Sequence, residues 1–500
     1  MTIVDQQDGP TSGSDISDLR AKDWDLLVVG GGTAGIVGAR TAASFGARVL
    51  LVERDRTGGD CLWTGCVPSK SLLAAARAAA DARAATRFGV HTGDVHVDFT
   101  QVMEHVRAAI AAIAPADSVA ALEAAGVQVM AGNLTFTGAH TADVDGRLVR
   151  FAQALVATGA APAIPPIVGL TCARVLTSDT IWDLSSRPER LVVLGGGSIG
   201  CELGQAFARL GSQVTIIEGT DRVLPREDAA ASAVIAAILS HEGVRVITGV
   251  LVAAVDATDG PGRGGRLSLQ DGSQVEYDEL LVAVGRAPRT AGMGLAAAGV
   301  DVDQRGFVVV DKHLRTTNRH IWAAGDLTAH PQFTHIAGVH GSLAASNAIL
   351  GLRRSVDTTT TPRVTFTHPE VAAVGVSTGQ AHNRDDLTLL EWGNGHLDRA
   401  VIEGATLGFT RLVVDAKGRV LGATVVGPRA GETLGELTLA VRHGLRTRDL
   451  AGTTHAYPTY NDGLWNAAIV DVRSRLSRPA MVRATRALAG LRRRWVRGRR

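Results

Sequence analysis

The sequence predicts an α/β protein with several domains, and three observations support this prediction. The chain has 500 residues, whereas a single hydrophobic core stops growing at roughly 250 to 300 residues. Its 58 glycines exceed the usual share of about 7%, as a fold with many tight turns requires. An apolar strand, a glycine-rich turn and a helix of small residues also occur in this order twice, within residues 26–53 and 191–218. Such units build parallel sheets that are covered by helices.

The composition excludes secreted and membrane-spanning classes. Four cysteines in a chain of this length are too few for the disulfide framework of a secreted protein, which indicates a reducing compartment. Residues 1–23 are polar and acid-rich, without the basic start and apolar core of a signal peptide, and no later run reaches about 18 uninterrupted apolar residues. We therefore expect a cytoplasmic protein with a short disordered leader at 1–23.

The charge is distributed unevenly along the chain. The formal net charge is +2, but residues 473–500 contain eleven arginines and no acid, so the rest of the chain carries about −9. Within this segment Leu488, Leu491 and Trp495 recur at helical spacing. The basic tail therefore predicts either a weak contact with an acidic membrane surface or a solvated end that touches the acidic body. We expect no specific nucleic-acid partner.

The first glycine-rich turn predicts a Rossmann-like, dinucleotide-binding domain. In "WDLLVVGGGTAGIVGARTAASFGARVLLVERD", Gly30 makes the tight turn, Gly32 allows the backbone to approach a pyrophosphate, and Gly35 allows close helix packing. The phosphate lies at the helix N-terminus, where backbone N–H groups point outward. Glu53, at the end of the next strand, accepts hydrogen bonds from a ribose.

The same pattern returns in "RLVVLGGGSIGCELGQAFARLGSQVTIIEGTDRVL", with Gly195, Gly197, Gly200 and an acid at Glu218. A second dinucleotide is therefore expected. A carboxylate at this position binds a free 2′-hydroxyl and repels a 2′-phosphate, so NADH is favoured over NADPH, although Arg222 nearby keeps NADPH as an alternative.

Between the two turns, "GGDCLWTGCVPSK" contains Cys61 and Cys66, which are a structural pair, metal ligands or a redox couple. A disulfide between residues five apart requires a distorted turn, for which Gly65 gives freedom. Pro68 is expected as the first residue of the following helix, which places Cys66 at a helix N-terminus that stabilises a thiolate. No cluster of further cysteines or histidines completes a zinc site, so no metal site is expected. A reducing compartment disfavours a structural disulfide, and a redox pair is therefore favoured.

Over Trp24 to about Arg475 the chain resembles the class I, flavin-dependent pyridine nucleotide–disulfide oxidoreductases, which include dihydrolipoamide dehydrogenase, glutathione reductase and mercuric reductase. The resemblance rests on motifs that occur in the family's order: "GGGTAG", "GGDCLWTGCVPSK", "ATGAAP", "GGGSIGCE", "AVGRAPRT", "IWAAGDL", "FTHPEVAAVG" and "HAYPTYND".

The resemblance implies two Rossmann-like domains that bind FAD and NAD(P)H, a C-terminal α+β dimerisation domain, and a homodimer in which that domain completes the partner's site. The implied boundaries are a leader at 1–23, an FAD-binding domain at 24–160 and 290–352, an NAD(P)-binding domain at 161–289, a dimerisation domain at 353–476 and a basic tail at 477–500.

The resemblance also implies the roles of individual residues. Electrons pass from NAD(P)H through FAD to a Cys61–Cys66 disulfide and on to an acceptor. Lys70 and Glu202 form a pair beside the flavin. The residues implied for FAD are Gly30, Gly32, Gly35, Glu53, Gly59, Lys70, Leu134, Asp326 and Thr334, and those implied for NAD(P)H are Gly195, Gly197, Gly200, Glu218, Val250 and Gly285.

One motif departs from the disulfide-reducing members. Tyr457 stands where they have the histidine that moves the proton, and Asp462 replaces the accompanying glutamate. Tyrosine is a poor base at neutral pH, since its pKa is near 10; His455, two residues earlier, is a candidate substitute.

Because mercuric reductases also have tyrosine at this position, we expect a mercuric-reductase-like enzyme whose acceptor is a soft metal ion, a quinone or a small disulfide. The alternatives are a dihydrolipoamide dehydrogenase and a redox-sensing flavoprotein that docks partners through its basic tail.

Overall fold

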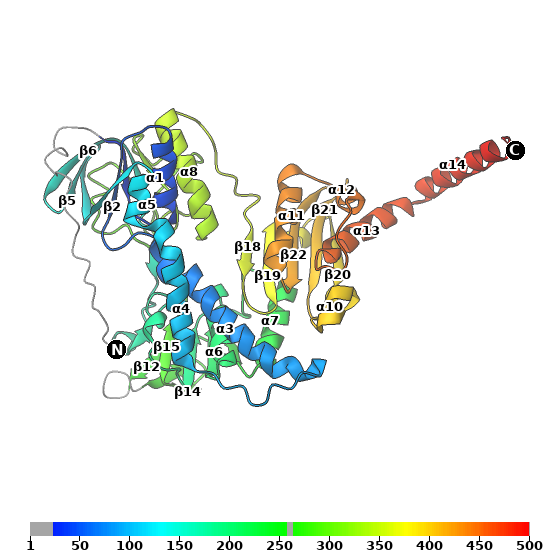
Figure 1. Ribbon diagram of the computed structural model, residues 1–500, viewed down its shortest axis with the longest axis horizontal. Coiled ribbons are helices and arrows are strands. Elements are labelled where there is room, and N and C mark those ends of the chain that lie inside the picture. The colour runs from blue at the N-terminus through cyan, green and yellow to red at the C-terminus, as the bar shows by residue number, and fades with distance from the viewer. Residues whose placement is uncertain (1–23, 258–263, 500) are drawn as a thin grey trace. The chain divides into compact units, whose positions relative to one another are not determined.

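The computed structural model describes residues 24–257 and 264–499, so the predicted leader lies outside the described residues. The chain forms two compact units, and each is assembled from three separate stretches (Figure 1). The first unit contains residues 24–68, His105–Ala163 and Arg286–Val356, and the second contains Ser69–Glu104, the described residues of 164–285 and residues 357–499. Both units combine sheets with covering helices, which confirms the predicted α/β class.

The first unit is built on a seven-stranded sheet in the order β3-β2-β1-β6-β5-β4, with β17 also paired to β6. Strands β3, β2, β1, β6 and β17 are parallel, whereas β4 and β5 are antiparallel additions to the first half of the long β6. The strands are β1 (Trp24–Val29), β2 (Val49–Glu53), β3 (Val127–Ala131), β4 (Leu134–Gly138), β5 (Thr141–Val144), β6 (Arg147–Val156) and β17 (Ile321–Ala323).

Both faces of this sheet are buried, which explains why β1 reads as a nearly continuous apolar run. Leu26 and Val28 face one core, to which α1 and α8 contribute, and Leu27 and Val29 face the other. The helices of this unit are α1 (Thr33–Ser44), α2 (Gly59–Trp63), α5 (Val119–Ala124) and α8 (Thr334–Leu350).

The second unit contains a parallel sheet of its own in the order β11-β10-β9-β15-β8, beside an antiparallel β12-β13-β14 meander. Apolar residues of β9, β10, β13 and β15 share one core. The elements are β8 (Val175–Leu176), β9 (Arg190–Leu194), β10 (Gln213–Glu218), β11 (Arg245–Thr248), β12 (Val252–Ala257), β13 (Gly265–Leu269), β14 (Gln274–Tyr277), β15 (Glu279–Val282), α6 (Ser198–Arg209) and α7 (Ala229–His241).

The C-terminal part of the second unit is an antiparallel sheet, β18-β19-β22-β21-β20, packed against α11 and α13. Helix α14 follows α13 and extends beyond this sheet (Figure 1). The elements are β18 (Arg363–Thr365), β19 (Glu370–Gly375), β20 (Leu387–Gly393), β21 (Phe409–Asp415), β22 (Val420–Gly427), α9 (Thr378–His382), α10 (Asp398–Glu403), α11 (Ala430–His443), α12 (Thr447–Gly452), α13 (Asp462–Leu476) and α14 (Pro479–Arg497).

Two further pairs of elements lie where the chain passes between the units. Strands β7 (Ala160–Pro162) and β16 (Arg286–Pro288) pair antiparallel in the first unit. Helices α3 (Cys66–Ala84) and α4 (Phe99–Ile113) each contain residues of both units. The remaining short 3-10 helices are Ala85–Phe88, Ala114–Asp117, Leu170–Cys172, Ile181–Asp183 and Asn394–His396.

One helical stretch among the described residues, Phe99–Ala124, is long and apolar enough by composition to cross a membrane. It consists of α4, a 3-10 turn at Ala114–Asp117 and α5. Helix α4 has 15 residues, about 22 Å at 1.5 Å per residue, which is short of a hydrocarbon core of about 30 Å.

Candidate active site

The first glycine-rich turn has the geometry expected for a phosphate site. Gly30 has a φ of 104°, and a Cβ on Gly35 would lie 1.9 Å from the Gly30 carbonyl oxygen, so both positions require glycine. Gly32 is the residue that caps the N-terminus of α1. The Glu53 carboxylate lies at the same turn, where Oε2 accepts a hydrogen bond from the backbone N–H of Gly31 at 2.6 Å.

The second turn repeats this geometry closely. Gly195 has a φ of 105°, and a Cβ on Gly200 would again lie 1.9 Å from the carbonyl oxygen at the start of the turn. Gly197 caps α6, and no heavy atom lies within 4 Å of a Cβ placed on it. Glu218 Oε2 accepts from the N–H of Gly196 at 2.7 Å. Both turns therefore leave room at a helix N-terminus beside a carboxylate, which fits a dinucleotide pyrophosphate and ribose.

The surroundings of Glu218 bear on the choice of nucleotide. The guanidinium of Arg222 pairs with Asp221 at 3.3 Å and donates to the carbonyl of Pro225 at 3.3 Å. The guanidinium charge of Arg222 is therefore partly engaged by residues of its own loop. The carboxylate of Glu218, in contrast, lies at the glycine-rich turn, where it would meet the ribose of a bound nucleotide.

The segment that contains the cysteines lies against the first turn. Gly59, with a φ of 60°, approaches so closely that a Cβ on it would be 2.6 Å from Gly32 Cα. Cys61 follows in the short helix α2. Gly65 then approaches the start of α2, since a Cβ there would lie 2.8 Å from the carbonyl oxygen of Asp60. The distorted turn that a C-x₄-C pair requires is thus present.

Helix α3 begins at Cys66, so the prediction that Pro68 is its first residue is wrong. Pro68 is the third helical residue. Proline is tolerated there because the N–H groups of the first turn have no acceptor within the helix. The expectation that depended on Pro68 nevertheless holds, since Cys66 lies at the N-terminus of a 19-residue helix.

Cys61 and Cys66 are both thiols in the structure. Cys66 Sγ lies 3.2 Å from Thr334 Oγ1, at the first residue of α8. The pKa of Cys61 is raised, first by its hydrogen bond to Cys66, then by burial and by the charge of Cys66. Cys61 therefore favours its protonated form.

Lys70 and Glu202 form the ion pair that the sequence predicted. Lys70 Nζ lies 2.9 Å from Glu202 Oε2, and the Glu202 side chain is 7% exposed. Glu202 Oε1 accepts a hydrogen bond from the backbone N–H of Phe366 at 2.9 Å. The Lys70 ammonium also lies 4.4 Å from the centre of the Phe366 ring. Both oxygens of the buried carboxylate are therefore engaged.

A charged cluster around Asp60 was missed by the sequence analysis. Arg286 Nη2 forms an ion pair with Asp60, and Arg289 Nη1 lies 3.1 Å from Asp60 Oδ1. Arg286 Nε lies 3.5 Å from Asp326 Oδ2. Burial, the main cause, raises the pKa of Asp326, and Arg286 opposes this shift. The cluster joins the residue before Cys61 to a residue predicted to hold FAD, although Asp60 and Arg286 are 226 positions apart in the sequence.

The remaining predicted binding residues occupy turns and strand ends. Leu134 is the first residue of β4 and is 8% exposed. Val250 lies between β11 and β12, and Gly285, with a φ of 147°, directly precedes β16. No heavy atom lies within 4 Å of a Cβ placed on Gly285.

Tyr457 and Asp462 do not form a pair with each other. The Tyr457 hydroxyl donates to Asp398 Oδ2 at 2.5 Å, whereas Asp462 Oδ2 accepts from the N–H of Thr459. The hydrogen bond to Asp398 and the charge of that carboxylate raise the pKa of Tyr457. Tyr457 is 72% exposed, and because its pKa is raised, an even smaller fraction than in an ordinary tyrosine is ionised to act as a base at neutral pH.

His455, the candidate substitute base, has both ring nitrogens near partners in its own domain. Nε2 lies 2.9 Å from Glu436 Oε1, and Nδ1 lies 3.0 Å from the carbonyl oxygen of Thr453. Nearby, the Tyr460 hydroxyl donates to Glu403 at 2.8 Å. These contacts hold the loop that carries Tyr457.

In the part of the chain that the structure describes, no group of three or more His, Cys, Asp or Glu side chains is arranged to hold a metal ion.

Comparison with known families gives two matches that together span most of the chain. Residues 24–341 match the family described as pyridine nucleotide-disulphide oxidoreductase. Residues 361–468 match the dimerisation domain of the same family.

Individual relatives cover nearly the same length. The chain is 39% identical over 459 residues to a mercuric reductase of Streptomyces lividans, covering 89% of this chain and 95% of that protein. It is 33% identical over 450 residues to a dihydrolipoyl dehydrogenase of Chlamydia pneumoniae, covering 88% of this chain and 95% of that protein. Among solved structures, the Cu(II) complex of the HOCl-induced flavoprotein disulfide reductase RclA from Escherichia coli has a TM-score of 0.81 at 28% identity, covering 90% of this chain and 99% of that one.

Proposed function

We propose an electron acceptor for this chain from the premise that it belongs to the class I pyridine nucleotide–disulphide oxidoreductase family, whose members are FAD-dependent enzymes that use NAD(P)H. When bound, FAD supplies the two-electron relay between the nicotinamide and the cysteine pair. The acceptor that we propose is a soft metal ion bound as substrate by Cys61 and Cys66.

The binding residues predicted from the sequence form part of this proposal. Gly30, Gly35 and Gly59 bring backbone so close that a Cβ has no space, which supports a phosphate site at the first turn. We assign FAD to Gly30, Gly32, Gly35, Glu53, Gly59, Lys70, Leu134, Asp326 and Thr334, and NAD(P)H to Gly195, Gly197, Gly200, Glu218, Val250 and Gly285. The acid at Glu218 and the engaged guanidinium of Arg222 favour NADH.

The single observation that carries the choice of acceptor is the hydrogen bond from Tyr457 to Asp398. When a disulfide acceptor is reduced, its sulfur atoms must be protonated as they leave as thiols. A side chain with a pKa near 7 transfers this proton best at neutral pH. The pKa of Tyr457 is raised, and its hydroxyl keeps its proton while it donates a hydrogen bond to Asp398. A metal ion requires thiolates as ligands and no proton at the acceptor.

The relatives support a metal acceptor by the metals that their names and titles print. Mercuric reductases are among the similar proteins, and RclA has been solved as a Cu(II) complex. The electrons balance for both ions. One NADH gives two electrons, which reduce one Hg²⁺ to the metal or two Cu²⁺ to Cu⁺, and NAD⁺ and one proton are released. The match to the dimerisation domain supports a homodimer, in which we propose that this domain completes the partner's site.

An acceptor panel tests the proposal. The FAD-loaded enzyme is supplied with NADH or NADPH and with Hg²⁺, Cu²⁺, a soluble quinone, lipoamide or glutathione disulfide. We expect metal-dependent NADH oxidation that is lost in Cys61→Ser and retained in Cys172→Ser, the matched control at an exposed cysteine.

Each other outcome identifies a different function. Faster turnover with lipoamide than with either metal would make the chain a dihydrolipoamide dehydrogenase, as one relative is named. Reduction of the cysteine pair by NADH without turnover of any acceptor would indicate a redox-sensing flavoprotein.

A further inference from the structure

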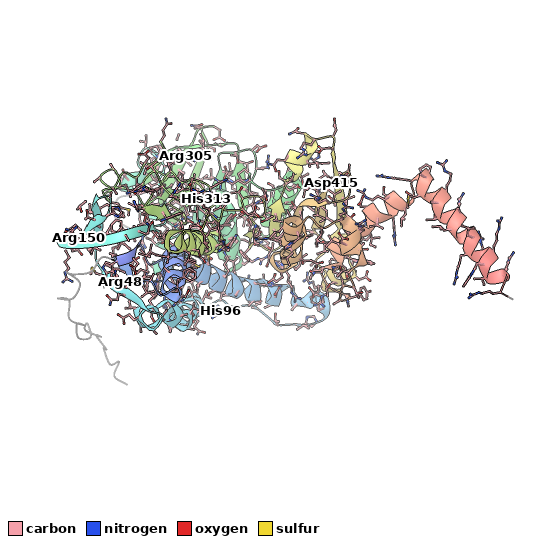
Figure 2. All side chains as sticks on the ribbon, turned by 90° about the horizontal axis from the view of Figure 1, so that it is seen from above. Arg48, His96, Arg150, Arg305, His313 and Asp415 are labelled. Carbon is pink, nitrogen blue, oxygen red and sulfur yellow. The ribbon has the colours of Figure 1, made fainter. Side chains whose placement is uncertain are left out.

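Helix α14 is a long element that buries none of its side chains. It has 19 residues and no buried residue, whereas the preceding helix α13 buries Leu464, Ala467 and Ala468 among others. Figures 1 and 2 both show α14 continuing from α13, away from the sheet β18–β22. Packing within its own unit therefore does not explain why this helix has apolar residues.

The side chains of α14 are sorted onto two opposite faces. At about 100° per residue, four of its large apolar residues fall within an arc of about 80°, and five of its arginines fall within an arc of about 100° on the other side. The apolar residues Met481, Leu488, Leu491 and Trp495 are each between 42% and 65% exposed. The basic face consists of Arg483, Arg486, Arg493, Arg494 and Arg497.

The basic face has no acidic partner within residues 24–257 and 264–499. Elsewhere in the same unit, arginines are neutralised by short ion pairs, such as Arg209 with Glu242 at 2.6 Å and Arg411 with Asp228 at 2.5 Å. At the edge of the apolar face, the guanidinium of Arg492 lies 4.2 Å from the centre of the Trp495 ring. The face is thus a row of cations without counter-charges, beside an exposed indole.

We propose that α14 lies in the plane of an anionic phospholipid bilayer. Its apolar face enters the boundary between headgroups and acyl chains, and its arginines contact lipid phosphates, which guanidinium groups bind in bidentate fashion. Trp495 lies at the level of the headgroups, where the amphipathic indole is most stable. Charge complementarity selects anionic over neutral lipids.

A bilayer engages both faces of α14, whereas nucleic acid and a second copy of the helix each engage only one. Nucleic acid attracts the arginines but leaves the apolar arc in water. A second copy of α14 buries the apolar arc but brings two arginine-rich helices together without counter-charges. The proposal goes beyond the reductase activity and does not depend on the identity of the acceptor.

Vesicle sedimentation with the full-length, FAD-loaded enzyme tests the proposal. The vesicles are phosphatidylcholine alone or phosphatidylcholine with phosphatidylglycerol. We expect the enzyme to pellet with the anionic vesicles only, and less at high salt, since screening weakens the arginine contacts.

Two variants separate the contributions of the faces. Leu488→Gln/Leu491→Gln/Trp495→Gln removes the apolar contact, and Arg486→Gln/Arg493→Gln/Arg494→Gln removes three charges. We expect each to bind anionic vesicles at least about tenfold more weakly, with unchanged NADH oxidation as a sign of intact folding. The matched controls, Leu148→Gln and Arg305→Gln, change exposed residues outside the tail and are expected to bind as the wild type does.

Three results would overturn the proposal. The first is that the enzyme pellets equally with neutral and anionic vesicles. The second is that both tail variants bind anionic vesicles as the wild type does. The third is that the tail substitutions alter only self-association or binding to DNA and leave vesicle binding unchanged.

Discussion

The hydroxyl of Tyr457 donates a hydrogen bond to Asp398 Oδ2 at 2.5 Å, within the domain that the family uses for dimerisation. Asp398 is the first residue of α10 and Tyr457 lies in the loop between α12 and α13, 59 positions apart in the sequence. The carboxylate disfavours loss of the phenolic proton, and it also fixes the direction of the ring. Tyr457, at the motif position where the disulfide-reducing members have a histidine, therefore acts as a hydrogen-bond donor.

Replacing Asp398 with Asn is expected to lower the pKa of Tyr457 towards its ordinary value of about 10, because the neutral amide no longer opposes the phenolate. The chain has three tyrosines, so ring-labelled tyrosine gives three signals that NMR titration can follow, and Tyr457→Phe assigns the one in question. An unchanged midpoint in Asp398→Asn would show that the carboxylate does not control this hydroxyl.

Replacing Lys70 and replacing Glu202 are expected to lower the free energy of unfolding by different amounts. Lys70→Met leaves a nearly buried carboxylate without its cation and is expected to lower the free energy of unfolding by about 1 to 3 kcal/mol, the low end reflecting the partly exposed lysine. Glu202→Gln keeps an acceptor for the Phe366 N–H and is expected to cost less. Urea unfolding of the FAD-saturated enzyme measures both. Equal losses in the two variants would contradict the role given to the buried charge.

The same two variants bear on the cysteine pair. If Lys70 and Glu202 lie by the bound flavin as proposed, both slow the NADH-dependent appearance of two titratable thiols. Lys70→Arg, which keeps the charge, is the control and is expected to retain more of the rate.

Arg286 and Arg289 differ in what they neutralise. Arg286 contacts both Asp60 and Asp326, whereas Arg289 contacts Asp60. Arg286→Met is therefore expected to weaken FAD binding by about tenfold, since it leaves a half-buried Asp326 without its nearest cation. Arg289→Met is the matched control with a smaller effect. Fluorescence of released FAD measures the two dissociation constants, and an equal loss in both variants would refute the assignment.

His340 predicts a pH-dependent stability. The side chain is 4% exposed, and burial together with the nearby His330 lowers its pKa to about 4. Between about 6.5, the value in the unfolded chain, and 4, the unfolded state binds more protons, so stability falls as the pH is lowered through this window. The full effect of this one group is about 3 kcal/mol.

His340→Phe removes the titrating group and is expected to flatten the stability curve between pH 6.5 and 4. The exposed His335, replaced in the same way, serves as the control. Urea midpoints at several pH values measure the slopes, and identical slopes in the wild type and His340→Phe would exclude His340 as the source.

Local patterns predicted the parts of the site that are local in the sequence. Gly30 and Gly35, like Gly195 and Gly200, are five residues apart, and a Cβ on Gly35 or Gly200 would collide with the carbonyl oxygen of the first glycine of the same turn. The error at Pro68 has a local cause as well, because proline is compatible with several positions of a first helical turn.

Contacts between distant segments could not be predicted in the same way. Asp60 meets Arg286 across 226 positions, and no spacing rule connects them. The hydroxyl of Tyr457 reaches Asp398 on another element, 59 positions away, and the motif that contains Tyr457 gives no sign of this partner. Such pairs depend on how strands and helices are arranged in space, which periodicity does not determine.

If α14 binds a membrane as proposed, its presence in a chain that forms homodimers has a consequence for how firmly the enzyme is held there. A homodimer carries two copies of this helix. Once one copy is bound, the other is held near the same membrane at a high effective concentration, so two weak contacts combine into an avidity well above that of either. Retention at the membrane would then report on subunit assembly, and dilution to monomers would release the enzyme without any change in the lipid.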